Sequence, residues 1–271
     1  MATHRFLIAG AGGRMGRAVI RAAVETPGVA LAGGVDRAES AAVGQDLGPL
    51  AGLDALGLKV THTDAAKLDA ATAVIDFSAP GASVALAARA AETGTSMVIG
   101  TTGFAAEEEA AIVRAAEKTA IVKSGNMSLG VNLLAALVKE AAARLDPAHY
   151  DIDIIEAHHR DKVDAPSGTA LMLGRAAADG RGVALDDVAA HDRSGKRADG
   201  AIGFAVVRGG GIVGEHSALF AGRQEVIELT HKAIDRDLFA RGAVTAAQWA
   251  AGRPPGLYDM TDVLGLYSGR Q

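Results

Sequence analysis

Residues 156–173, with the sequence EAHHRDKVDAPSGTALML, concentrate side chains that can bind anions and transfer protons. Two histidines, an arginine and a lysine lie within positions 158–162, just before Pro166 and the Ser167-Gly168-Thr169 turn. A histidine titrates near neutral pH and can give or take a proton, and a lysine can do the same when its surroundings depress its pKa. The stretch is therefore a candidate acid–base centre.

The same stretch also has the features of an anion site. Ser167-Gly168-Thr169 precedes the apolar ALML and is typical of a helix N-terminus, where free amides attract negative charge. With the cations of positions 158–162 in front of it, this terminus suits a substrate with two carboxylates. Beside a nicotinamide, such a site favours the reduction of a carboxylated C=C or C=N bond, with the proton coming from the cluster.

Other interpretations of these residues remain open from the sequence alone. The adjacent histidines at 158–159 could ligate a metal, although no fitting third ligand is evident. Asp161 and Asp164 could neutralise the cations and leave an ordinary solvated loop. His216 and His231 fall in predicted neighbouring strands, and we interpret them as structural or interface groups.

A glycine-rich loop, Gly10-Ala11-Gly12-Gly13-Arg14-Met15-Gly16, is the second candidate site. It joins the apolar run at 5–9 to a helical pattern at 14–26, and Asp36 ends the next apolar run. Glycine amides at a helix N-terminus favour a pyrophosphate, and an acid at the end of the second strand binds the adenosine ribose. Met15 stands where the strict G-x-G-x-x-G pattern has glycine, so a purely structural glycine turn is the alternative.

Arg14 and Arg37 bear on the choice of dinucleotide. A cation beside the ribose-binding acid can accommodate the extra phosphate of NADP, which Asp36 would repel and Arg37 would attract. The pair predicts tolerance of both NADH and NADPH, unless Arg37 is a solvated surface residue.

Three further polar loops are predicted at the carboxyl ends of parallel strands, where open α/β sheets bind ligands. Thr101 and Thr102 would offer hydroxyls and amides to a ribose or a nicotinamide. The loops are Phe77-Ser78-Ala79-Pro80, Gly100-Thr101-Thr102-Gly103 and Ser124-Gly125-Asn126-Met127-Ser128.

The elements that must position these loops alternate along the chain. Continuously apolar runs at 72–78, 96–103 and 119–126 are separated by helical patterns at 81–94 and 105–118. Strands of this kind are buried on both faces, which predicts an α/β protein with a Rossmann-type doubly wound parallel sheet.

The pattern changes beyond residue 127. A long helix is predicted at 128–145, and the segments 151–158 and 202–233 alternate polar and apolar residues, as in a sheet with one wet face. This pattern predicts an α+β domain with a mostly antiparallel or mixed sheet. The expected boundaries are 1–127, completed by 237–271, for the dinucleotide-binding domain and 128–236 for the second domain.

Composition excludes several classes of site and partner. The chain of 271 residues contains no cysteine, which excludes disulfides, thiolate nucleophiles and Cys-ligated metals. Its formal net charge of −5 argues against a general nucleic-acid binder and weakly against an anionic membrane surface. No apolar run approaches the ~20 residues of a membrane span, and the start is too short and Gly-rich for a signal peptide, so we expect a cytoplasmic protein.

The chain resembles the 4-hydroxy-tetrahydrodipicolinate reductase family, the lysine-pathway enzymes also called dihydrodipicolinate reductases, from end to end. The E-A-H-H-R-x-K-x-D-A-P-S-G-T-A pattern is highly specific to that family. The other matching segments are GAGGRMG, DFSAP, GTTGF, SGNMSLGVN, GEHSALFA, ELTHKA and GLYDMTDVLGL.

This resemblance implies a role for each candidate residue. His158 would be the proton donor or acceptor, and Lys162 the second proton donor and cationic partner. The substrate contacts would be His159 and the backbone of Gly168 and Thr169. The nucleotide-binding positions would be Gly10, Ala11, Gly12, Gly13, Arg14, Met15, Asp36, Arg37, Gly100, Thr101, Thr102, Ser124, Gly125, Asn126 and Met127.

The resemblance also implies the reaction and the assembly. The reaction would be NAD(P)H-dependent reduction of (2S,4S)-4-hydroxy-2,3,4,5-tetrahydrodipicolinate to (S)-2,3,4,5-tetrahydrodipicolinate with loss of water, in lysine biosynthesis through diaminopimelate. The second domain would bind this dicarboxylate and assemble a homotetramer through its sheets, and no metal is implied. Many family members have Glu in place of Asp36 and an aromatic residue in place of Met127, so the choice between NADH and NADPH is open.

Two alternatives differ in what they require of the site. A reductase or dehydrogenase of another carboxylated imine or oxo acid would use the same cations, so a substrate panel must separate the two. A dinucleotide-sensing binding protein without turnover would not need His158 and Lys162 beside a site that binds carboxylates. It would show nucleotide affinity without hydride transfer.

Overall fold

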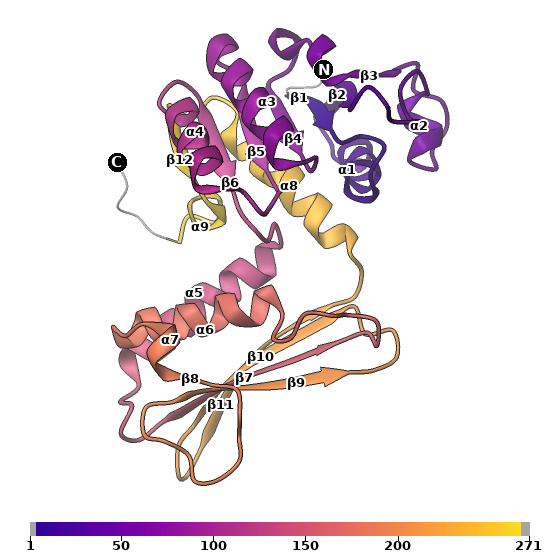
Figure 1. Ribbon diagram of the computed structural model, residues 1–271. Coiled ribbons are helices and arrows are strands. Elements are labelled where there is room, and N and C mark those ends of the chain that lie inside the picture. Colours follow the sequence, from indigo (N-terminus) through magenta and orange to yellow (C-terminus); the bar gives the residue numbers. More distant parts are fainter. Residues whose placement is uncertain (1–3, 267–271) are drawn as a thin grey trace. The chain divides into compact units, whose positions relative to one another are not determined.

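The computed structural model describes residues 4–266 and divides the chain into two compact units (Figure 1). The first unit holds the described residues up to Leu129 and those from Asp237 onward, and the second holds Gly130–Arg236. Within residues 4–266, none of the helices has the length and apolar character needed to cross a membrane.

The first unit is built on a seven-stranded sheet of order β12-β6-β5-β4-β1-β2-β3, in which every pairing is parallel. From β3 to β6 this is the strand order of the doubly wound dinucleotide-binding fold, which confirms the predicted Rossmann-type architecture. The strands are β1 (His4–Ala9), β2 (Val29–Asp36), β3 (Val60–His62), β4 (Ala73–Asp76), β5 (Ser96–Ile99), β6 (Ala120–Lys123) and β12 (Gly256–Tyr258).

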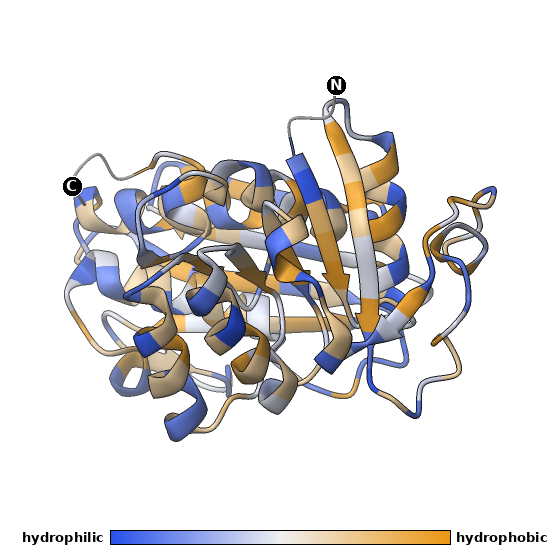
Figure 2. Cartoon of the chain, turned by 90° about the horizontal axis from the view of Figure 1, so that it is seen from above, coloured by the Kyte–Doolittle hydropathy of each residue, from blue (hydrophilic) through white to orange (hydrophobic). Residues whose placement is uncertain are grey.

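Helices cover both faces of this sheet. Successive residues of a strand point to opposite sides, and the apolar side chains on each side are buried against helices. In β1, Phe6 and Ile8 belong to one apolar core and Leu7 to another, and the strands are mostly hydrophobic, as the orange segments of Figure 2 show. The first core includes α1 (Arg14–Glu25) and α8 (Asp237–Ala250), and the second α3 (Pro80–Thr93) and α4 (Ala106–Ala116). The short helices of the unit are α2 (Leu47–Leu50), η1 (Thr63–Ala65), η2 (Leu68–Ala70) and α9 (Met260–Val263).

The second unit contains a five-stranded sheet of order β11-β10-β7-β9-β8. Strand β10 pairs antiparallel with β7 and β11, whereas β9 pairs parallel with β7 and β8. The sheet is therefore mixed, because the chain passes through helix α6 (Gly168–Arg181) between β7 and β9, as a parallel pairing requires. The strands are β7 (Asp151–His158), β8 (Ala189–Ala190), β9 (Ile202–Arg208), β10 (Gly214–Ala221) and β11 (Val226–Ala233).

One face of this sheet packs against α5 (Leu129–Arg144) and α6, and α7 (Leu185–Val188) lies near its edge. Along β7 every second residue is buried, so Ile152 and Ile154 enter the core while their neighbours do not. The next two buried positions are Glu156 and His158. The apolar face of β7 thus becomes polar at its carboxyl end.

Candidate functional site

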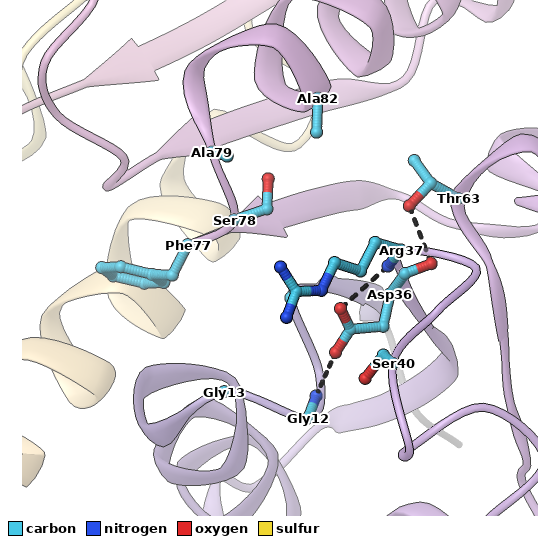
Figure 3. A pocket seen from close by; sticks show the side chains of 11 residues that line it. Gly12, Gly13, Asp36, Arg37, Ser40, Thr63, Phe77, Ser78, Ala79 and Ala82 are labelled. Atoms are coloured by element: carbon cyan, nitrogen blue, oxygen red, sulfur yellow. Dashed lines mark hydrogen bonds between the residues drawn. The ribbon is translucent and has the colours of Figure 1, made fainter.

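A pocket of about 340 Å³ lies in the first unit at the carboxyl edge of its sheet (Figure 3). It brings together the glycine loop, the end of β2 and the loop after β4. The residues that line it are Gly10, Gly12, Gly13, Asp36, Arg37, Ser40, Thr63, Phe77, Ser78, Ala79 and Ala82.

The glycine loop is tight enough to exclude side chains at two positions. Gly10 has φ 72°, and a Cβ there would lie 2.7 Å from the carbonyl oxygen of Phe77. A Cβ on Gly16 would lie 2.1 Å from the carbonyl oxygen of Gly10. Helix α1 begins at Arg14, and Met15 packs against the apolar core. With Met15 in place of the third glycine of the strict pattern, its side chain therefore packs against the core.

Asp36 lies directly against the glycine loop. Its Oδ2 accepts a hydrogen bond from the Gly12 amide (2.8 Å) and its Oδ1 accepts one from the Arg37 amide (2.8 Å), as Figure 3 shows. The Thr63 hydroxyl donates to the Asp36 carbonyl (3.1 Å). The Arg37 side chain extends into the pocket, and Arg14 is exposed at the start of α1.

A second carboxylate, Asp76 at the end of β4, ties neighbouring loops together and is fully buried. It accepts hydrogen bonds from the Ser78 amide (3.0 Å), the Ser83 hydroxyl on α3 and the Thr101 hydroxyl (3.2 Å). Burial raises the pKa of Asp76, although these bonds act in the opposite direction. Asp76 therefore joins the loop after β4 to the loop after β5.

The loops after β5 and β6 meet the same edge of the sheet. A Cβ on Gly100 would lie 2.1 Å from the Phe77 ring, so the backbone after β5 packs directly on that ring. Thr102 and Gly125 are exposed, and a Cβ on Gly125 would lie 3.9 Å from the Thr102 methyl group. The two loops are thus neighbours, as their predicted positions at strand ends require.

The loop after β6 is held by its own polar groups. The Ser124 hydroxyl donates to the Asn126 carbonyl (2.8 Å), and the Asn126 side-chain oxygen accepts from the Ser128 amide (2.9 Å). Met127 is 2% exposed and belongs to the apolar core, and a Cβ on Gly242 would lie 1.8 Å from its carbonyl oxygen. The Met127 side chain is therefore part of the core.

In the second unit, His158 ends β7 and is buried. Its Nδ1 lies 2.5 Å from Oε2 of Glu156, two residues earlier on the same face of the strand. Its Nε2 faces β10, where a Cβ on Gly214 would lie 3.1 Å from that atom. The glycine leaves space beside Nε2, the ring nitrogen not bound to Glu156.

Glu156 is 1% exposed and accepts hydrogen bonds from three residues. The Arg208 guanidinium donates to both carboxylate oxygens, each at 2.7 Å, and the Ser167 amide donates to Oε1 (2.9 Å). Burial raises the pKa of Glu156, but the bonds from Arg208, His158 and Ser167 outweigh it and hold the pKa below its ordinary value. Glu156 is therefore a charged, buried carboxylate beside His158.

Ser167 connects this carboxylate to α6 and to a second histidine. Its hydroxyl caps the helix by accepting from the Ala170 amide (3.1 Å) and lies 3.0 Å from Nε2 of His216. The His216 and His158 ring centroids are 5.0 Å apart, with the rings edge to face. Burial, assisted by the charge of His158, lowers the pKa of His216 to about 4, so His216 is neutral at pH 7.

Lys162 forms an ion pair with Asp164, whose two carboxylate oxygens both lie 2.8 Å from Nζ. The hydrogen bond from Lys162 holds the pKa of Asp164 below its ordinary value. The sequence left open whether Asp164 neutralises one of the cations, and the structure shows that it pairs with Lys162. Because the Asp164 side chain is 62% exposed, such a pair contributes at most about 1 kcal/mol, and another carboxylate can exchange for it.

The remaining predicted substrate residues lie around the same end of β7. His159 Nε2 is 3.1 Å from Nη2 of Arg236. Gly168 and Thr169 are the first two residues of α6, where the positive end of the helix dipole lies. Among residues 4–266, there is no group of three or more His, Asp or Glu side chains able to hold a metal ion.

Sequence reasoning missed several residues of these two sites. Glu156 had a local signal, because it continues the alternation of Ile152 and Ile154 on the buried face of β7. The others are Asp76 at the end of β4, and Arg208, His216 and Arg236, which reach the second site from distant elements.

Comparisons with known proteins agree in both units. The sequence profile described as "Dihydrodipicolinate reductase, N-terminus" matches residues 4–127, and the one described as "Dihydrodipicolinate reductase, C-terminus" matches residues 130–264. The 4-hydroxy-tetrahydrodipicolinate reductase of Rhodopseudomonas palustris (strain BisB18) is 54% identical over 269 residues, covering 98% of this chain and 99% of the relative. That of Parvibaculum lavamentivorans is 54% identical over 266 residues, covering 97% of this chain and 98% of the relative.

Solved structures share the architecture. A dipicolinate-bound dihydrodipicolinate reductase from Paenisporosarcina sp. TG-14 aligns with a TM-score of 0.76 at 23% identity, covering 96% of this chain and 98% of the other. An amine dehydrogenase from Mycobacterium smegmatis aligns with a TM-score of 0.63 at 15% identity, covering 94% of each chain. At these identities the likeness establishes the fold alone.

Proposed function

The chain belongs to the 4-hydroxy-tetrahydrodipicolinate reductase family, and we propose how its residues divide the work of that reaction. The protein is an NAD(P)H-dependent oxidoreductase of lysine biosynthesis through diaminopimelate. It reduces (2S,4S)-4-hydroxy-2,3,4,5-tetrahydrodipicolinate to (S)-2,3,4,5-tetrahydrodipicolinate with loss of water. The contact between His158 and the buried Glu156, beside the N-terminus of α6, is the observation that carries the assignment of roles.

The first unit would hold the dinucleotide, which supplies hydride when bound. Residues 10–15 of the glycine loop offer amides at the start of α1. A Cβ at Gly10 would collide with the backbone of Phe77, so this position needs glycine. Asp36 would take the adenosine ribose and Arg37 the extra phosphate of NADPH. The segments 100–102 and 124–127 would complete the site, with Met127 contributing its backbone because its side chain is in the core.

The second unit would hold the dicarboxylate. Gly168 and Thr169, at the start of α6, and the Lys162 ammonium would bind one carboxylate, and His159 would make a further contact. The exposed Asp164 is a weak partner of Lys162, so a substrate carboxylate can take its place.

Proton transfer would fall to His158. Its Nδ1 faces the Glu156 carboxylate, so Nε2, beside Gly214, is the atom that gives or takes the proton. Lys162 would be the second proton donor and would stabilise negative charge that develops on the substrate.

The test is a coupled assay in which the preceding synthase generates the substrate and the consumption of NADH or NADPH is followed. We expect turnover with both cofactors and a loss of at least about 2 kcal/mol of transition-state stabilisation in Lys162→Ala, from kcat/KM. Lys139→Ala is the matched control, because Lys139 forms an exposed pair with Asp179 in the same unit. Wild-type kcat/KM in Lys162→Ala would remove Lys162 from the mechanism, and turnover only with other imines or oxo acids would reassign the substrate.

We further propose a homotetramer assembled through the second unit's sheet and located in the cytoplasm. Helices α5 and α6 cover one face of the sheet, while Val207 and Val226 are 49% and 59% exposed. Exposed β-branched residues on a sheet favour burial against another subunit. Sedimentation should give a tetramer for the wild type and smaller species for Val226→Glu. A monomeric wild type would refute the assembly, and cell fractionation tests the location.

A further inference from the structure

We propose that Glu156 and Arg208 are positioning residues for His158. Glu156 would set which ring nitrogen carries the proton, and Arg208 would limit how strongly the Glu156 charge acts on the ring. The inference rests on the proposed role of His158 in proton transfer and adds two groups that do not themselves touch the substrate.

The three side chains are brought together by strand register. Glu156 and His158 are two residues apart on β7 and therefore point to the same face. Arg208 is the parallel-register partner of His158 on β9, and its guanidinium reaches diagonally to both oxygens of Glu156 at 2.7 Å. The Arg208 side chain is 19% exposed and also donates to the Asp164 carbonyl (2.8 Å). A planar guanidinium in a two-pronged contact fixes the carboxylate in one orientation.

That orientation determines the state of the imidazole. A charged carboxylate can only accept hydrogen bonds, so the nitrogen facing it, Nδ1 at 2.5 Å, must carry hydrogen. In the neutral ring the lone pair is then on Nε2, and in the charged ring Nε2 carries the transferable proton. The space at Gly214 lies beside this same atom. Glu156 thus directs proton transfer to Nε2.

Glu156 also fixes the distance between the His158 imidazole and the start of α6, where a substrate carboxylate is proposed to bind. Glu156 Oε1 accepts from the Ser167 amide (2.9 Å), and Ser167 is the N-cap of α6. Gly168 and Thr169 follow directly. Rotation of Glu156 would therefore move the proton-transfer group and the helix terminus relative to each other.

Titratable groups surround His158 on the strands of its sheet and on the adjoining loop. The charges on Lys162 and Asp164 are paired with each other. Burial favours the neutral form of His216 on β10 and of His231 on β11. Glu156 and Arg208 are then the charged groups whose removal changes the field at the ring most. Loss of the Glu156 charge leaves a cation nearby, and loss of the Arg208 charge leaves an anion, so the two changes have opposite signs.

The experiment compares the pH profiles of kcat/KM for Glu156→Gln and Arg208→Gln in the full-length enzyme with synthase-generated substrate. We expect the limb of the profile that His158→Gln abolishes to move to lower pH in Glu156→Gln and to higher pH in Arg208→Gln, each by at least about half a pH unit. We also expect kcat to fall by at least about tenfold in Glu156→Gln. Glu140→Gln, which removes an exposed glutamate paired with Arg144 on α5, should leave the profile unchanged.

Shifts in the same direction, or no shift in either variant, would overturn the inference, because a merely structural defect lowers activity without moving the profile in opposite directions. Arg208→Lys retains the charge and should keep this limb of the pH profile near its wild-type position. If circular dichroism shows that Arg208→Gln is poorly folded, the position of the limb in Arg208→Lys tests the inference instead. Failure of the proposed function is distinguishable, since the wild type would then not turn over the substrate or His158→Gln would keep the wild-type profile.

Discussion

Asp76 in the first unit and Glu156 in the second are both buried carboxylates on strands, 0% and 1% exposed, but their partners differ. Asp76 accepts from neutral hydroxyls and an amide, whereas Glu156 accepts from an amide, a guanidinium and an imidazole. Burial raises the pKa of Asp76, while the bonds to Glu156 hold its pKa below the ordinary value despite burial. The donors are Ser78, Ser83 and Thr101 for Asp76, and Arg208, His158 and Ser167 for Glu156.

This difference separates two uses of a buried acid. Neutral donors can hold Asp76 whether it is ionised or not, so it serves as a junction between the loops that approach the pocket. Cationic donors keep Glu156 charged, and a charged partner is what an imidazole needs if its ring nitrogens are to have fixed roles. The contrast predicts that the two carboxylates respond differently to loss of a partner and to pH.

The largest expected effect is on the free energy of unfolding when Glu156 loses the Arg208 guanidinium. Arg208→Gln leaves a buried charge poorly compensated, and we expect the free energy of unfolding near pH 8 to fall by about 3 kcal/mol. Glu156→Gln combined with Arg208→Gln removes both charges and should recover at least about half of that loss. Urea denaturation followed by circular dichroism measures both. A double variant whose loss equals the sum of the single losses would contradict the coupling.

The next effect concerns His216, the neutral neighbour of this charged cluster. Its pKa is about 4 in the folded protein against an ordinary 6.5, so its stabilisation is present above pH 6.5 and is lost as the pH falls toward 4. The loss should reach up to about 3 kcal/mol across that window. His216→Gln should have a flatter stability profile between those pH values, and parallel profiles for the two proteins would refute the assignment.

The smallest effect tests the two carboxylates directly, with a slope of opposite sign for each. A raised pKa means that Asp76 contributes stability below its unfolded value of 3.8, and this is lost as pH rises through its folded pKa. A lowered pKa means that Glu156 contributes stability above 4.5, and this is lost as pH falls through its folded pKa.

Each contribution should be on the order of 1 kcal/mol. The measurement is the pH dependence of unfolding for the wild type minus Asp76→Asn, and for the wild type minus Glu156→Gln. Fluorescence of Trp249, the single tryptophan, reports on the unit that contains Asp76. Slopes of the same sign would show that the partners do not control the two ionisations.

Much of the first unit could be predicted because its signals are local. Each apolar run is a strand buried on both faces, and the position of a loop after such a strand places it at one edge of the sheet. The segments around Gly10, Asp36 and Phe77 therefore meet in one pocket, as the parallel sheet requires.

The charged cluster was only partly predictable, because its partners depend on register. Nothing near Arg208 in the sequence shows that it lies opposite His158, since this follows from the parallel pairing of β7 with β9. His216 likewise joins the cluster through the antiparallel pairing of β10 with β7. Its interpretation as a structural or interface group overlooked its place beside the imidazole, 5.0 Å away.

The most direct test of the account is the position of the proton on the His158 ring. Long-range ¹H–¹⁵N NMR of the full-length enzyme near pH 8, assigned by the signals missing in His158→Gln, reports which ring nitrogen is protonated. We predict that Nδ1 carries hydrogen in the wild type, and that Glu156→Gln gives a mixture of rings with hydrogen on Nδ1 and rings with hydrogen on Nε2. Hydrogen on Nε2 with Nδ1 unprotonated in the wild type would contradict the account, because Glu156 would then have no part in directing the proton.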